Sequence, residues 1–149
     1  MEGFGGIIAF TLGWLLAQVM KLLIEVFRKR GRIKLHEVSE CLTKSGGMPS
    51  GHAASFVALT TFLGLYEGFN TGIFAVSFGV TLIIIYDAIN VRWAVGEQGK
   101  LLNSLAKQSG RRNRVKIVEG HTLLQVVIGS LLGVLIGALI FVCWKELFF

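Results

Sequence analysis

The segment Gly46-Gly47-Met48-Pro49-Ser50-Gly51-His52 stands directly before an apolar run from Ala53 to Tyr66. Proline fixes φ near the helical value and suits the first turn of a helix, so the segment predicts a helix that begins near Pro49. The first N–H groups of a helix lack partners within it, and the helix dipole adds positive charge there. We therefore expect a helix start that favours an anion.

Two side chains add chemistry to this helix start. Ser50 carries a hydroxyl, and His52 carries an imidazole that exchanges protons near neutral pH. The combination suits a phosphate ester. The same four letters, Pro-Ser-Gly-His, also suit a plain helix cap followed by a surface histidine. These residues alone leave both interpretations open.

Apolar residues gather into runs long enough to cross a bilayer, which takes about 20 helical residues. Hydrophobic residues make up 53% of the 149 and charged residues only 16%, which does not fit a soluble globular domain. The expected spans are Phe4–Phe27, Thr71–Ile89 and Thr122–Val142, with Ala53–Tyr66 as a shorter fourth. The sequence predicts one membrane-embedded domain over residues 1–149, an all-α bundle of about four transmembrane helices.

Basic residues are confined to two of the links between these runs. The net charge is +6, and all of the 15 Lys and Arg except Lys21 and Lys145 lie within 28–44 or 92–116. The positive-inside rule makes the side of these links the cytoplasm, with both termini outside. Basic loops can also bind nucleic acid, but between membrane spans topology and lipid headgroups explain them better. We expect no nucleic-acid partner.

A polar face marks the cytoplasmic end of the first expected helix. Gln18, Lys21, Glu25 and Arg28 follow a 3-4-3 spacing, which places them on one side of a helix. A lysine near a helix end also snorkels and pairs with a carboxylate such as Glu25, which is the structural alternative. Because a polar face directed into a bundle is more often functional, Lys21 and Arg28 are candidate functional residues.

Two further polar pairs are expected at the same end of the bundle. Asp87 and Arg92 follow the third run, where a carboxylate at the membrane border requires a partner such as Arg92 or Lys21. His121 and Gln125 lie one turn apart at the start of the last helix, so the glutamine can hydrogen-bond the imidazole. With helices alternating in direction, all of these groups and the Pro-Ser-Gly-His segment converge on one membrane face.

Small residues and cysteines are weaker indications of how the helices pack and of what the chain binds. Two stripes of small residues at four-residue spacing are present: Ala9, Gly13 and Ala17, and Gly129, Gly133 and Gly137. Such stripes let helices approach closely in lipid, and they also suit a homo-oligomer. Cys41 and Cys143 show no metal-ligand spacing, and we expect neither a metal nor a cofactor.

Taken together, the polar pairs resemble the three signatures of the type 2 phosphatidic acid phosphatase superfamily. Lys21 and Arg28, with six residues between them, resemble the first signature, Pro49-Ser50-Gly51-His52 the second, and His121 with Gln125 the third. The chain is similar to a short, divergent branch of that superfamily, related to acid phosphatases and vanadium haloperoxidases. The matching stretches cover most of the chain in order: Ser45 to Ser50, Tyr86 to Ala88 with Val91 and Arg92, and Gly120 to Thr122.

This resemblance implies metal-free hydrolysis of a lipid phosphate monoester, such as phosphatidate or an isoprenyl phosphate, by an integral membrane enzyme. It implies that His121 attacks phosphorus to form a phosphohistidine, and that His52 protonates the leaving alkoxide and then helps to activate water. The groups implied or proposed to hold the phosphoryl oxygens are Lys21, Arg28, Ser50, the Gly51 backbone and Arg92.

Three positions depart from the family pattern. Lys29 stands where the family has proline, Val115 where it has arginine, and Gln125 where it has an acid. Candidates for the missing arginine are Arg92, Arg114 and Lys116, and candidates for the missing acid are Asp87 and Glu119. A glutamine can orient an imidazole but cannot balance its positive charge. Two alternatives therefore stay open: a non-catalytic membrane protein that binds phosphorylated lipid, and a structural bundle or transporter subunit.

Overall fold

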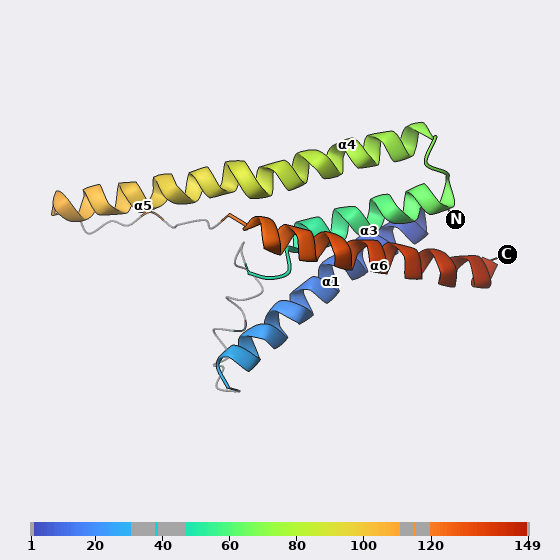
Figure 1. Cartoon of the computed structure of the whole chain (residues 1–149), viewed down its shortest axis with the longest axis horizontal. Helices are drawn as coiled ribbons and strands as arrows, with labels where there is room; N and C mark the ends of the chain where they lie inside the picture. Colours follow the sequence, from blue (N-terminus) through green and yellow to red (C-terminus); the bar gives the residue numbers. More distant parts are fainter. Residues whose placement is uncertain (1, 31–37, 39–46, 111–114, 116–119, 149) are drawn as a thin grey trace.

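The computed structural model describes residues 2–30, 38, 47–110, 115 and 120–148 (Figure 1). Within this part the chain forms helices and no strand: α1 (Glu2–Arg28), α3 (Gly51–Tyr66), α4 (Gly72–Tyr86), the π-helix η1 (Asp87–Val91), α5 (Arg92–Gln108) and α6 (Leu123–Phe148). The predicted all-α fold is confirmed. Several residues that the sequence analysis named lie outside the described part: Cys41, Ser45, Gly46, Arg114, Lys116 and Glu119.

Helix α3 is the central element and packs against α1, α4 and α6 (Figure 1). A Cβ built on Gly133 of α6 would lie only 2.6 Å from the carbonyl oxygen of Ala54. A Cβ on Gly13 of α1 would lie 2.8 Å from that same oxygen, and one on Gly137 would lie 2.5 Å from the carbonyl oxygen of Ala58. The predicted small-residue stripes thus let three backbones meet within one chain, which maximises packing in lipid.

Hydroxyl groups hold α4 against α3. The Oγ1 atom of Thr60 lies 2.7 Å from Ser77 Oγ and 2.8 Å from Thr81 Oγ1, and the Thr81 hydroxyl donates to the carbonyl of Phe56. Interhelical hydrogen bonds of this kind are worth about 0.6–2 kcal/mol within a membrane. The other faces of α4 carry largely exposed apolar side chains such as Val76, which suit contact with lipid.

Among the residues that the structure describes, three helical segments have the length and composition to cross a membrane: Phe4–Arg28, Gly72–Gln108 and Leu123–Leu147. Helix α3 is shorter, because it begins at Gly51 and has 16 residues, a length of about 24 Å. The helix starts close to Pro49, as the sequence predicted, but Pro49 itself does not lie in its first turn. Ser50 takes the N-cap position in an extended conformation, which leaves Pro49 outside the helix.

Helices α4 and α5 form one rod through η1, without an intervening loop (Figure 1). The helix does not end where the expected span Thr71–Ile89 ends, because the chain continues without a break into α5, Arg92–Gln108. No glycine or proline lies between Tyr86 and Val95 to end the helix. The only departure from α-helical geometry at this junction is the π-turn η1.

Candidate functional site

His52 and His121 lie close to each other at the starts of α3 and α6. These helix starts lie at the end of the bundle opposite the two chain termini (Figure 1). His52 lies in the first turn of α3, and His121 lies two residues before α6. Their ring centroids are 6.4 Å apart and the ring planes meet at 63°. His121 is only 4% exposed. The structure therefore brings together two imidazoles that stand far apart in the sequence.

The π-turn holds the backbone of His121. In η1 the Arg92 N–H donates to the carbonyl of Asp87, five residues back, so the turn departs from the α-helical ladder. The carbonyl of Ala88 in this turn accepts a hydrogen bond of 3.0 Å from the N–H of His121. A π-turn is frequent at functional sites, and this one fixes the residue that carries the more buried imidazole.

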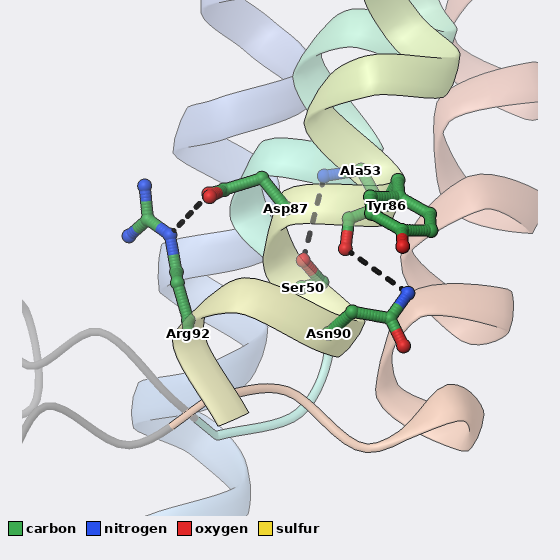
Figure 2. Close-up of polar contacts among 6 residues, drawn as sticks. All are labelled: Ser50, Ala53, Tyr86, Asp87, Asn90 and Arg92. Atoms are coloured by element: carbon green, nitrogen blue, oxygen red, sulfur yellow. Dashed lines mark hydrogen bonds and ion pairs between the residues drawn. The ribbon is translucent and has the colours of Figure 1, made fainter. Parts of the chain in front are cut away.

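The side chains on η1 point to two sides of the turn (Figure 2). On one side Arg92 Nε donates to Asp87 Oδ2 at 2.7 Å, so Arg92, rather than Lys21, is the ion-pair partner of Asp87 shown by the structure. On the other side the Asn90 amide donates to the carbonyl of Tyr86. The guanidinium of Arg92 also retains further N–H groups that the Asp87 contact does not use.

Ser50 connects α3 to α6. Its Oγ accepts from the N–H of Ala53 at 3.4 Å (Figure 2), and its own N–H donates to the carbonyl of Gln125 at 3.0 Å. The residue is completely buried. The first two N–H groups of α3, those of Gly51 and His52, have no acceptor in the described part of the chain. These two groups are the ones an anion can meet at this helix start.

Lys21 reaches the same helix start from α1. Its side chain is 8% exposed, and a Cβ built on Gly51 would lie 3.9 Å from its Nζ atom. Arg28 differs: it is 75% exposed at the side chain and pairs with Glu25 at 3.5 Å. Seven residues along a helix is about 10 Å, and the end of α1 extends away from the other helices (Figure 1). The structure does not bring Arg28 to the histidines.

The environment of His121 favours its neutral form. Burial is the main cause that lowers the pKa of His121 below the usual histidine value of 6.5, and the hydrogen bond with Gln125 opposes it. The positive charge of Lys21, the neighbouring ring of His52 and the charge of Arg92 lower it further. A neutral imidazole near pH 7 keeps a nitrogen lone pair and can act as a nucleophile.

The hydrogen bond between His121 and Gln125 is the one the sequence predicted. Nδ1 of the ring lies 3.2 Å from Oε1 of the amide. The contact of His121 with Ala88, and the backbone link between Ser50 and Gln125, were missed. The T-x-x-Q pattern at residues 122–125 is typical of a helix N-terminus and could have predicted the start of α6. No sequence pattern predicts the π-turn. No group of three metal-ligating side chains occurs in the described residues.

An all-α membrane bundle with paired histidines and cations at one end is the architecture that the sequence signatures implied. Residues 5–136 match the Divergent PAP2 family, and the chain belongs to that family. It is also similar to the uncharacterized membrane protein YuiD of Bacillus subtilis (strain 168), with 32% identity over 111 residues, which are 64% of this chain and 70% of that protein. No solved structure matches the chain.

Proposed function

We propose that this protein is a metal-independent phosphatase that hydrolyses a lipid phosphate monoester through a phosphohistidine. One observation carries the proposal: two imidazoles lie 6.4 Å apart beside the buried Lys21, in a chain of the Divergent PAP2 family. Opposed imidazoles at this separation can meet a single phosphoryl group from two sides. General acid–base catalysis and a covalent intermediate both require such proximity.

The first step transfers the phosphoryl group to the enzyme. Nε2 of His121 attacks phosphorus as the bond to the lipid oxygen breaks, and His52 gives its proton to the leaving alkoxide. In the second step His52 takes a proton from a water molecule, whose oxygen attacks phosphorus as the bond to His121 breaks. Inorganic phosphate leaves, and both imidazoles return to their starting protonation states.

Positive charge at the helix start stabilises the transferring group. Lys21 and the N–H groups of Gly51 and His52 border the same space. Arg92 adds charge from the start of α5 and stands in for the arginine that Val115 replaces. Donors aimed at developing charge lower the barrier more than a mobile solvent does.

Two residues proposed from the sequence take other roles. The buried hydroxyl of Ser50 serves the helix cap and holds the N–H groups of α3 in place. Arg28, exposed about 10 Å further along α1, attracts the lipid phosphate as it approaches and does not contact the phosphoryl group during its transfer.

Phosphatidate and isoprenyl phosphates are the substrates that this setting suits. The helices present apolar side chains to lipid along their length, while the polar groups gather at one end. A lipid can then keep its tail in the bilayer and offer its phosphate to the site. We place this end at the cytoplasmic face, a proposal that the distribution of Lys and Arg supports.

The test is phosphate release from phosphatidate by the full chain in detergent, with a chelator present. We expect turnover by the wild type and none by His121→Ala. His36→Ala removes the one histidine outside the signatures and serves as the matched control. Trapping of a phosphorylated wild-type protein that is absent in His121→Ala would identify the intermediate. No turnover by a folded wild type on either phosphatidate or an isoprenyl phosphate contradicts the proposal.

A second function has one observation in its favour. Gln125 offers a neutral amide where the related enzymes have an acid, so the imidazolium formed in turnover lacks a balancing charge. A protein that binds phosphorylated lipid without hydrolysing it would keep Lys21 and the α3 helix start. Binding to phosphatidate vesicles that needs Lys21 but not His121, with no phosphate release, would establish this alternative.

A further inference from the structure

Helix α6 opens with two reciprocal hydrogen bonds between Thr122 and Gln125. The N–H of Gln125 donates to Thr122 Oγ1 at 3.4 Å, and the N–H of Thr122 donates to Gln125 Oε1 at 3.1 Å. The helix begins at Leu123, so Thr122 is the N-cap and Gln125 is the third helical residue. This arrangement is a capping box, which satisfies two donors at the start of a helix.

The capping box determines which way the Gln125 amide faces. An amide group has one acceptor end and one donor end, and the backbone N–H of Thr122 can only donate. The atom that faces Thr122 must therefore be the amide oxygen. That same oxygen lies 3.2 Å from Nδ1 of His121. With only an acceptor opposite it, Nδ1 must carry the ring proton, and Nε2 keeps its lone pair.

We infer that Thr122 is a positioning residue: its hydroxyl, by accepting from the Gln125 N–H, keeps residue 122 in the N-cap geometry in which its own N–H orients the Gln125 amide. The oriented amide holds His121 in the tautomer whose Nε2 is free to react. The catalytic consequence of this assignment rests on the proposed function, whereas the tautomer itself does not. The helix cap and the imidazole thus depend on one shared oxygen atom.

Because residue 125 is a glutamine and not an acid, its side chain needs a partner that orients it. A carboxylate presents an acceptor whichever way it turns, so it needs no partner to orient it. An amide that turned over would present a donor to Nδ1 and favour the tautomer with the proton on Nε2, which cannot attack phosphorus. Thr122 should therefore matter in the presence of Gln125 and lose its importance when residue 125 is glutamate.

A double-mutant cycle with two readouts tests this dependence. The proteins are the wild type, Thr122→Val, Gln125→Glu and the double variant, with Thr122→Ser as the matched control that keeps the hydroxyl. One readout is kcat and KM for phosphatidate in detergent. The other is the ¹⁵N spectrum of histidine-labelled protein, which separates protonated from unprotonated ring nitrogens. The chain has three histidines, so His121→Ala assigns the relevant signals by difference.

In the wild type we expect Nδ1 of His121 to be protonated and Nε2 to be unprotonated. Thr122→Val should introduce the second tautomer and lower kcat by about fivefold with KM unchanged, because without its hydroxyl residue 122 no longer keeps the N-cap geometry that directs its N–H at the Gln125 amide. Thr122→Ser should leave both readouts as in the wild type. In the Gln125→Glu background, the change at residue 122 should alter neither the tautomer nor kcat.

Three results would separate the possible failures. An equal loss of kcat from Thr122→Val in both backgrounds would reduce Thr122 to an ordinary helix cap and overturn the inference. A wild-type spectrum with the proton on Nε2 would also overturn it. A wild type without phosphatase activity, but with the expected tautomer and its expected change in Thr122→Val, would overturn the proposed function and support the orientation by Thr122.

Discussion

The two histidines and the two nearest cations are held in different ways. The histidines stand on the α3–α6 contact, where a Cβ built on Gly129 would lie 2.5 Å from the carbonyl oxygen of Ser50. The cations Lys21 and Arg92 reach the site on long side chains, from α1 and from the end of η1. Backbone contact between α3 and α6 therefore fixes the two imidazoles, while the two cations, carried on long side chains, can adapt their positions.

The contribution of the cations can be tested by comparing Lys21 with Arg28, because the sequence analysis proposed the same role for both. Lys21→Met should lower kcat/KM for phosphatidate by about 100-fold, because it removes a buried charge beside the phosphoryl group. Arg28→Met should lower it by less than about fivefold, since an exposed charge paired with Glu25 contributes little. Equal losses would mean that the end of α1 swings inward when substrate binds.

The α3–α6 contact can be broken by a single methyl group. Gly133→Ala places a Cβ 2.6 Å from the Ala54 carbonyl oxygen and should lower the free energy of unfolding by about 1–3 kcal/mol. Thermal unfolding in detergent measures the loss. Gly79→Ala is the matched control, because a Cβ at Gly79 meets nothing within 4 Å. Similar unfolding temperatures for the two variants would show that the contact is looser than described.

The neutral state of His121 predicts how kcat/KM depends on pH. Because the pKa of this imidazole lies below 6.5, the acid limb of kcat/KM should fall at a pH lower than 6.5. Gln125→Glu should move that limb upward, since a carboxylate favours the charged ring. A pH profile of both proteins measures this, and an unchanged limb in Gln125→Glu would assign the limb to another group.

The same lowered pKa affects stability. The unfolded chain binds a proton at pH values where the folded His121 does not, so protonation favours unfolding. The stability of the folded state should therefore be complete above pH 6.5 and should decrease as the pH falls towards the pKa of His121 in the folded protein. Unfolding temperatures of the wild type and His121→Ala in detergent measure this, and parallel pH curves for the two proteins would contradict it.

The smallest expected effect concerns α4, which lies outside the α3–α6 contact. Thr60→Val should lower the free energy of unfolding by about 0.6 kcal/mol, the average for an interhelical hydrogen bond in a membrane. Thr11→Val is the control, because the hydroxyl of Thr11 bonds only to the carbonyl of Ile7 in its own helix. A Thr60→Val protein that loses activity at full stability would give α4 a direct role in the site.

Hydropathy, charge and residue spacing predicted much of this arrangement. Apolar runs predicted the order of the membrane helices, and the alternating direction of these helices was enough to bring His52 and His121 to one end. The pairing of His121 with Gln125 followed from a spacing of four. These features depend on composition and helical period, which any sequence displays directly.

The features that the sequence did not predict depend on where helices begin and how they tilt. Lys21 and Arg28 share a helical face, but only Lys21 lies where α1 still packs on α3. Ser50 carries a hydroxyl suited to phosphate, yet the cap of α3 uses it. The π-turn at η1 adjusts a helix by one residue, and its hydrogen bonds depend on tertiary contacts such as the one from His121 to Ala88.

The rod formed by α4, η1 and α5 has a mechanical consequence. Its 37 residues span about 55 Å at 1.5 Å per residue, well beyond the roughly 30 Å of a hydrocarbon core. A large part of the rod must therefore stand outside the apolar layer, with η1 along its length. A force that twists the protruding part of the rod is transmitted to η1, because no loop separates η1 from α4 or α5. The Ala88 carbonyl of η1 accepts a hydrogen bond from the His121 N–H, so the force also reaches His121.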